Sequence, residues 1–173
     1  MSEEKWKIRR LSKEDDRLAV SRVYEESWKS AYRDVIPQAY LESIPAGRWA
    51  GNLDQTDLRH MVLLVDGLIA GISSFGPSRF AALPDWGEVV SLYLLPAYTR
   101  KGYGKSLLKA AVDELGKMGF SDMFLWVLEE NHPARRFYEK CGFRQSEVRL
   151  QQNIGGRELQ EIQYRFRMGP DKT

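Results

Sequence analysis

The sequence has very few residues that could hold a metal or form a disulfide. Cys141 is the only cysteine among 173 residues, so the chain has no internal disulfide and no cysteine cluster for a metal. His60 and His132 are the only histidines, which disfavours a structural zinc site and a histidine-based hydrolase triad. We therefore expect no bound metal, and the single thiol fits a reducing compartment.

Charge of one sign and long apolar runs are also scarce. Lys and Arg number 26 and Asp and Glu 24, and a net charge of +2 is too small to attract nucleic acid or an anionic membrane by its field alone. The longest apolar run, Met61 to Val65, ends at Asp66, and residues 1–10 contain no stretch typical of a signal peptide. We expect a cytoplasmic protein that binds neither nucleic acid nor membrane.

The chain contains no linker-like tract of Pro, Gly or Ser and no internal repeat. Apolar residues make up 43% and charged residues 29%, a composition typical of a globular protein. A single domain is therefore expected over residues 6–168.

Apolar periodicity and turn residues predict the order of elements. We expect a strand over 7–11, a helix capped by Ser12 that ends near Tyr32, a helix over 38–43, strands over 61–65, 68–75 and 88–95, a helix over 104–118, a strand over 123–128, a helix from Pro133 to Gly142, and two strands around Gly155-Gly156. The segment 46–59 is ambiguous, and a helix that buries Trp49 is one interpretation.

Two local patterns set the expected topology. Asp66-Gly67 suits the positive φ angles of a tight hairpin turn, which makes the strands beside it antiparallel. The strand, helix and strand over 88–128 form a right-handed crossover, whose two strands are parallel. The expected fold is α/β, with a mixed, mostly antiparallel sheet, one parallel pair and about four flanking helices.

The stretch most informative about chemistry joins the strand that ends near Leu95 to the helix that starts near Gly104. Free N–H groups and the helix dipole favour an anion at a helix N-terminus, and glycines let an oxyanion approach the backbone. Arg100, Lys101 and Lys105 add positive charge. The alternative is a tight strand-to-helix turn beside a solvated basic surface.

Two phosphate-binding motifs do not fit this loop. A P-loop needs a glycine five residues before Gly104, where Thr99 stands. A dinucleotide fingerprint needs a third glycine where Leu107 stands. The loop does match the form R/Q-x-x-G-x-G/A, with Gly102 and Gly104 as its glycines.

In this respect the chain resembles the GNAT superfamily of acyl-CoA-dependent N-acetyltransferases. The family has a Leu-Tyr-Val-x-Pro-like strand end before the loop, and Leu92 to Pro96 stand in that place. A second family motif follows the next strand, and its residues here are Asn131, Ala134, Phe137, Tyr138, Gly142 and Phe143. The element order also agrees along about the whole chain. Thr99 departs from the usual Gln or Arg, which affects only a side-chain contact because backbone N–H groups are expected to hold the pyrophosphate.

The resemblance implies acetyl-CoA as the cofactor. The expected cofactor-binding residues are Leu92, Tyr93, Leu94, Thr99, Arg100, Lys101, Gly102, Tyr103, Gly104, Lys105, Ser106 and Asn131. A backbone N–H near Leu94 is the implied donor to the oxyanion. Asn131 is expected to contact the pantetheine arm, to cap the following helix, or to do both.

The resemblance also implies that a primary amine attacks the thioester directly, without an acyl-enzyme. Tyr138 occupies the family's tyrosine position and is expected to protonate the leaving thiolate, although its apolar helix face equally suits a core tyrosine. Glu88 is the candidate base, eleven residues before Thr99, as is the glutamate base of the histone-acetylating branch. A solvated or ion-paired carboxylate is the alternative for Glu88.

Acceptor specificity in this superfamily usually comes from the first two helices and the final hairpin, which here contain Trp28, Tyr32, Ile36 and the Gly155-Gly156 turn with Glu158 and Glu161. Trp28 and Tyr32 lie four residues apart and are candidates for the acceptor pocket, but such a pair also suits a core. The expected function is acetyl transfer from acetyl-CoA to a primary amine of a small molecule. The alternatives are an acyl-CoA-binding domain without turnover, acetylation of a protein amine, and a kinase built on Gly104-Lys105-Ser106. Homodimers are common among similar proteins.

Overall fold

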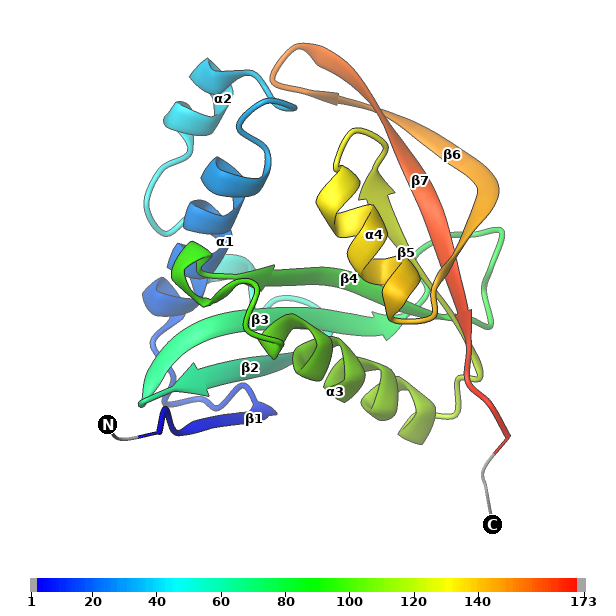
Figure 1. The fold of residues 1–173 in the computed structure, drawn as a ribbon, viewed down its shortest axis with the longest axis horizontal. Coiled ribbons are helices and arrows are strands. Elements are labelled where there is room, and N and C mark those ends of the chain that lie inside the picture. Colours follow the sequence, from blue (N-terminus) through cyan, green and yellow to red (C-terminus); the bar gives the residue numbers. More distant parts are fainter. Residues whose placement is uncertain (1–2, 171–173) are drawn as a thin grey trace.

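A computed structural model describes residues 3–170 and contains a seven-stranded sheet in the order β1-β2-β3-β4-β5-β7-β6 (Figure 1). The strands are β1 (Trp6–Arg10), β2 (Arg59–Val65), β3 (Leu68–Pro77), β4 (Gly87–Leu94), β5 (Asp122–Leu128), β6 (Arg144–Ile154) and β7 (Arg157–Arg167). The helices are α1 (Arg17–Ala31), α2 (Gln38–Ser43), α3 (Tyr103–Lys117) and α4 (His132–Lys140). Within the described residues β4 and β5 are parallel and the other neighbours antiparallel, so the predicted mixed α/β fold is confirmed.

The hairpin between β2 and β3 forms as the sequence predicts. Asp66 and Gly67 have φ angles of 50° and 82°, the left-handed region that a tight hairpin turn needs at both central positions. This turn fixes which residues of β2 and β3 face each other, so both strands bury their apolar residues in the centre of the sheet.

The parallel strands β4 and β5 pair over a short distance. Gly87 lies opposite Met123 and Glu88 opposite Phe124, and the two strands diverge beyond these pairs. The rest of β4 pairs with β3 on its other side, up to Leu94 opposite Gly71. The divergence leaves a gap in the sheet beside the second half of β4, and this gap positions the candidate site.

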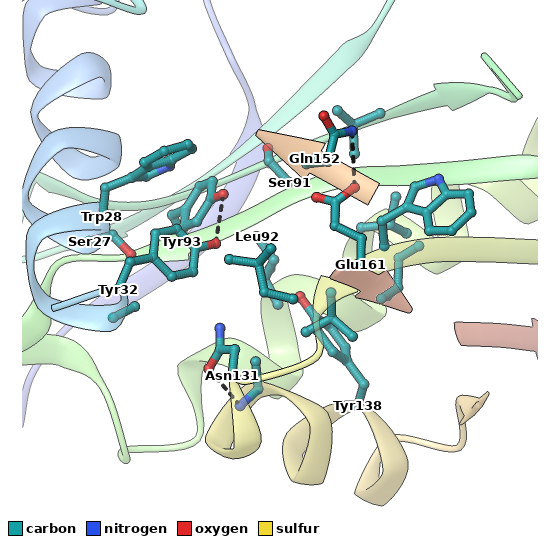
Figure 2. Close-up of a pocket in the computed structure, with 18 of the residues that line it drawn as sticks. Ser27, Trp28, Tyr32, Ser91, Leu92, Tyr93, Asn131, Tyr138, Gln152 and Glu161 are labelled. Atoms are coloured by element: carbon teal, nitrogen blue, oxygen red, sulfur yellow. Dashed lines mark hydrogen bonds between the residues drawn. The ribbon is translucent and has the colours of Figure 1, made fainter. Parts of the chain in front are cut away.

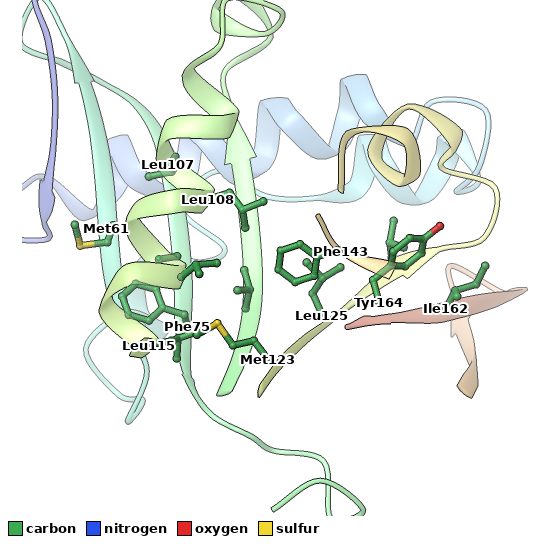
Figure 3. Packing of buried hydrophobic residues seen from close by; sticks show 14 residues of the cluster. Met61, Phe75, Leu107, Leu108, Leu115, Met123, Leu125, Phe143, Ile162 and Tyr164 are labelled. Atoms are coloured by element: carbon green, nitrogen blue, oxygen red, sulfur yellow. The ribbon is translucent and has the colours of Figure 1, made fainter. Parts of the chain in front are cut away.

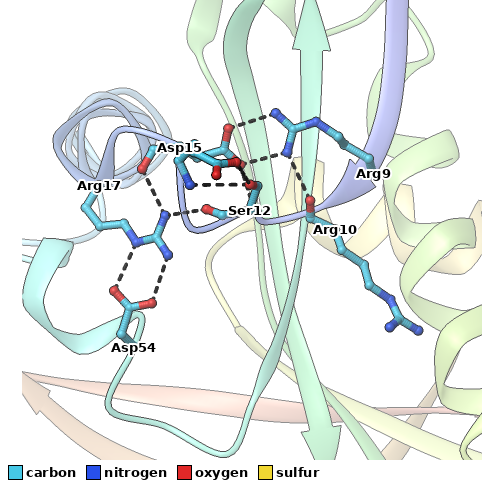
Figure 4. Close-up of polar contacts among 7 residues, drawn as sticks. Arg9, Arg10, Ser12, Asp15, Arg17 and Asp54 are labelled. Carbon is cyan, nitrogen blue, oxygen red and sulfur yellow. Dashed lines mark hydrogen bonds and ion pairs between the residues drawn. The ribbon is translucent and has the colours of Figure 1, made fainter.

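The predicted cap of the first helix is wrong. α1 begins at Arg17, and its N-cap is Asp16, whose carboxylate accepts the N–H of Leu18. Ser12 instead donates its N–H to Asp15, which also accepts two hydrogen bonds of 2.7 Å from the guanidinium of Arg9 on β1 (Figure 4). These tertiary contacts hold residues 12–15 as a turn, so the helix starts one turn later than the sequence predicts.

The ambiguous segment 46–59 does not form the helix considered for it. Its helical part is a single turn over Ala50–Asn52. Trp49 does point inward, because its ring stacks on Tyr24 at 5.3 Å and lies 5.5 Å from the ring of Trp28. The aromatic cluster on α1 therefore includes a residue from this segment.

One face of helix α3 packs into the main hydrophobic core. Its predicted apolar face is buried, with Leu107, Ala111 and Leu115 at 0% exposure, against Phe75 of β3 and Met123 of β5 (Figure 3). This packing fixes the N-terminus of α3 next to the end of β4. Among residues 3–170, no helix combines the length and apolar character needed to cross a membrane.

Candidate active site

A cavity of about 580 Å³ lies at the gap between β4 and β5. Its walls come from α1, β4, β5, α4 and the β6–β7 hairpin, and Figure 2 shows ten of its residues labelled. Two helices, four strands and the loop after β3, which contributes Arg79 and Phe80, therefore meet at one site. The cavity extends along β4 from Glu88 to Tyr93 and along β5 from Leu125 to Leu128, where the two parallel strands have separated.

The glycine loop has the geometry of an anion site. Arg100 and Gly102 have φ angles of 63° and 87°, and Gly102 is the N-cap of α3. In the described residues no side chain caps this helix, so its first N–H groups, from Tyr103 to Lys105, are available to a ligand. The loop fits a pyrophosphate, which its uncapped N–H groups and exposed basic side chains would bind.

Thr99 takes part in the fold of this loop. Its hydroxyl donates a hydrogen bond of 2.8 Å to the carbonyl oxygen of Pro96. The threonine side chain therefore closes the turn that precedes the glycines, where the family pattern usually has a longer Gln or Arg.

The end of β4 presents a free N–H group to the gap. Leu95 donates its N–H to Ala70 of β3 at 2.8 Å. Successive N–H groups of a strand point to opposite sides, so the N–H of Leu94 points away from β3 and toward the gap. This position agrees with the expected oxyanion donor, and its role stays a prediction.

Tyr138 of α4 lines the cavity and packs its ring against Phe137 and Phe143. Its hydroxyl has no hydrogen-bond partner among residues 3–170, whereas the hydroxyl of the buried Tyr164 binds Glu139 and Arg135. Burial raises the pKa of Tyr138 above its ordinary range, so the phenol carries its proton at neutral pH. Such a group can donate a proton into the cavity.

Asn131 caps α4 and also lines the cavity. Its side-chain oxygen accepts the N–H of Ala134 at 3.4 Å. The capping role predicted for Asn131 is therefore confirmed, while a contact with pantetheine stays a prediction.

An aromatic wall faces α4 across the cavity. Trp28 and Tyr32 of α1 meet edge to face at 5.1 Å, and the hydroxyl of Tyr32 lies 3.3 Å from that of Tyr93 on β4. Burial raises the pKa of Tyr32 to about 12. Tyr24 fixes α1 to the sheet by a hydrogen bond of 3.1 Å with Ser91. The structure thus brings Trp28 and Tyr32 to the same cavity as Tyr138.

Glu88 lines the cavity but is held by a partner. Its side chain is 2% exposed, and Arg79 donates three hydrogen bonds to it, from the main-chain N–H at 3.0 Å and from the guanidinium at 3.2 and 2.8 Å. The guanidinium thus binds the carboxylate through two charge-assisted hydrogen bonds. This agrees with the alternative, considered from the sequence, that Glu88 is an ion-paired carboxylate. Its role as a base stays a prediction.

Sequence reasoning missed Arg79, and it named Glu161 only as part of the final hairpin, without a role in the cavity. Arg79 lies in a loop between two prolines, where no periodicity indicates the direction of a side chain. Glu161 lies on β7 in the alternating pattern Leu159, Glu161, Gln163, so its inward position was available as an acidic residue on the buried face of a strand.

Comparisons with known proteins identify the family. The model of the acetyltransferase (GNAT) family matches residues 20–143, more than half of the chain. An uncharacterized N-acetyltransferase, YuaI of Bacillus subtilis, is 33% identical over 75% of this chain and 76% of its own length. A spermidine N(1)-acetyltransferase of Thermoplasma acidophilum is 30% identical over 79% of this chain and 87% of its own length.

Solved structures agree with these sequence matches. The PaiA N-acetyltransferase of Thermoplasma acidophilum in complex with coenzyme A has a TM-score of 0.72 at 25% identity and covers 94% of this chain and 99% of its own. YncA of Salmonella typhimurium with acetyl-CoA has a TM-score of 0.71 at 22% identity, covers 97% and 96% of the two chains, and shows the same fold. The chain therefore belongs to the GNAT family of N-acetyltransferases, enzymes whose cosubstrate is acetyl-CoA.

Proposed function

We propose that this protein transfers the acetyl group of acetyl-CoA to a primary amine of a small molecule. The observation that carries the proposal is the contact of the β6–β7 hairpin tip with residues 35–40, called the bridge below, whose neighbours Ile36 and Ile154 line the cavity. At the tip of the β6–β7 hairpin, Arg157 donates a hydrogen bond of 2.8 Å to the carbonyl oxygen of Val35, just after α1. In the same tip Gly155 packs so closely on Tyr40 of α2 that an added Cβ would lie 2.6 Å from the Cβ of Tyr40.

The bridge favours a small acceptor over a polypeptide. In Figure 1 the hairpin tip reaches over to α2, above the gap between β4 and β5. An extended polypeptide would need this side open to place its terminal amine in the cavity. A cavity of about 580 Å³ is within the usual range for small-molecule sites.

The named relatives support the same acceptor class. The relative that acts on spermidine matches 79% of this chain. By contrast, a [ribosomal protein bS18]-alanine N-acetyltransferase of Escherichia coli matches 38% of this chain and 44% of its own length. The match to the enzyme with a small-molecule acceptor extends over about twice as much of the chain.

The residues of the cavity, of the glycine loop and of the end of β4 divide the chemical work. Acetyl-CoA supplies an acetyl thioester. The N–H groups at the start of α3 bind the pyrophosphate, and the N–H of Leu94 stabilises the oxyanion that forms at the thioester carbonyl. Tyr138 gives its proton to the leaving thiolate. Glu88, the base predicted from the sequence, would first have to release Arg79 before it could accept a proton.

An acetylation assay with a panel of acceptors tests the proposal. The panel contains spermidine, 2-phenylethylamine, phenylalanine and an octapeptide with N-terminal alanine, and release of free CoA thiol is followed. We expect turnover of at least one small amine and a much lower kcat/KM for the peptide. Turnover of the peptide with no reaction of the small amines would refute the small-molecule acceptor.

A further inference from the structure

Two carboxylates line the cavity, and they differ in their partners. Glu88 accepts the hydrogen bonds of Arg79 and is almost fully buried, whereas the Arg79 side chain is largely exposed. Glu161 has no ion-pair partner among residues 3–170, and it accepts a hydrogen bond of 3.4 Å from the side-chain amide of Gln152. Figure 2 shows the Glu161 carboxylate directed into the cavity, between Gln152 and Tyr138. One negative charge of the cavity is therefore unbalanced.

The position of Glu161 is fixed by the sheet. On β7 it lies opposite Leu128 at the end of β5 and opposite Leu150 on β6. Both neighbouring residues are apolar and offer its carboxylate no polar side chain. The polar groups near this carboxylate therefore lie in the cavity. The charged and titratable groups that face it are Arg79 and Glu88, whose charges offset each other, and the phenols of Tyr138 on α4 and of Tyr32, the C-cap of α1.

We propose that Glu161 binds the ammonium group of the acceptor in the cavity and takes the proton that this group must lose before attack. The inference rests on the proposed function, because it assumes a small amine as acceptor. It assigns the base to β7, whereas the sequence placed it on β4 at Glu88. It also makes the acceptor a cationic alkylamine, since a half-buried carboxylate without an ion-pair partner lowers its energy by binding a cation.

The protons balance along this route. An ammonium group has three protons, and Glu161 takes the first and releases it to solvent, to which this half-buried side chain is open. The neutral amine then forms the C–N bond at the thioester carbonyl, and the C–S bond breaks when the resulting oxyanion collapses to the amide. Tyr138 protonates the leaving sulfur, and the second proton that the nitrogen loses restores the phenol. The third proton stays on the amide, and one proton is released per turnover.

The surroundings of Glu161 suit a proton acceptor. Burial raises the pKa of its carboxyl above the ordinary value, while the hydrogen bond from Gln152 acts in the opposite direction. A raised pKa reduces the difference between the pKa of the Glu161 carboxyl and that of the ammonium group, which makes the proton transfer less unfavourable. It also predicts that kcat/KM falls on the acidic side as Glu161 becomes protonated.

The test compares Glu161→Gln with two matched variants, Glu88→Gln in the same cavity and Glu147→Gln, an exposed position on the neighbouring strand β6. For the best amine of the panel, kcat/KM is measured between pH 5 and 9, and binding of the amine to CoA-saturated enzyme is measured by calorimetry. We expect Glu161→Gln to lower kcat/KM at least about tenfold, to weaken amine binding and to abolish the acidic limb. Glu147→Gln should match the wild type, and acetyl-CoA affinity should stay within about twofold in all variants.

A second variant keeps the test decisive if Glu161→Gln folds poorly. Glu161→Asp keeps the charge on a shorter side chain, so it should retain the acidic limb and part of the activity. Wild-type turnover with an unchanged pH profile in Glu161→Gln, or loss of the limb in Glu88→Gln instead, would refute the assignment of Glu161. A wild type that acetylates no small amine would refute the proposed function and the inference with it.

Discussion

Replacing Tyr138 with Phe should separate the chemical step from binding and from stability. The Tyr138 hydroxyl makes no hydrogen bond among residues 3–170, so its removal leaves no other group without a hydrogen-bond partner. The packing of the ring against Phe137 and Phe143 is retained. A positioned acid typically contributes a factor of about 10² to 10⁴, and we expect kcat to fall about 100-fold, or about 2.7 kcal/mol in activation free energy. The free energy of unfolding and the affinity for acetyl-CoA should barely change.

Replacing Tyr164 with Phe supplies the matched comparison. This tyrosine is 0% exposed, and its hydroxyl binds Glu139 at 2.8 Å and Arg135 at 3.1 Å, outside the cavity. The Tyr164→Phe variant should lose about 2 kcal/mol of stability, or roughly 4–8 °C in Tm, and keep kcat.

Steady-state kinetics, calorimetric binding of acetyl-CoA and thermal unfolding of both variants check the two expectations. Full kcat in Tyr138→Phe would refute the role of the phenol. A Tm that falls as far in Tyr138→Phe as in Tyr164→Phe would show that Tyr138 is a core residue.

Three further changes test the fold, the loop and the bridge. Arg9 lowers the pKa of Asp15 from 3.8 to about 2, so this pair stabilises the fold above pH 3.8 and the gain is lost as pH falls through about 2. In chemical denaturation Asp15→Asn should cost about 1–2 kcal/mol at pH 7, and the difference from wild type should shrink between pH 4 and 2; a constant difference would contradict the ion pair. Thr99→Gln should change the Kd of acetyl-CoA by less than about tenfold in calorimetry, if backbone N–H groups bind the pyrophosphate as proposed; a larger loss would contradict this. Arg157→Ala removes the hydrogen bond to Val35 and should raise kcat/KM for the octapeptide; an unchanged ratio of peptide to amine turnover would show that the bridge does not exclude polypeptides.

The elements predicted best from the sequence are those set by short-range patterns. The hairpin turn at Asp66-Gly67 depends on two residues that tolerate positive φ, and α3 depends on apolar spacing along a single helix. Both lie within about one residue of the prediction. The start of α1 was wrong because Ser12 and Asp16 can both cap a helix, and the contact of Asp15 with Arg9 on β1 decides between them.

The sequence predicts which residues lie at the site where a family motif contains them. It does not predict the hydrogen bonds and ion pairs that those residues make with distant parts of the chain. Tyr138 and Asn131 lie on the cavity as their motif implies. Glu88 also lies there, but its ion pair with Arg79 depends on how the loop after β3 folds back, which no spacing in the sequence encodes. A carboxylate can be located from the sequence, whereas its hydrogen-bond partners require the fold.

The sheet topology explains how β7 could contribute to the proposed chemistry. The divergence of β4 from β5 leaves the N–H of Leu94 and the phenol of Tyr138 on either side of a gap, and a reacting amine there must lie within reach of a proton acceptor. β7 pairs with the far edge of β5, so its inward residue Glu161 faces the gap. The pyrophosphate site proposed at the N-terminus of α3 adjoins the end of β4, where Gly104 lies next to the side chain of Leu94, whereas Glu161 lies on β7. In the proposed mechanism the sheet topology therefore separates a cation site from an anion site, and the thioester of a bound acetyl-CoA would lie between them.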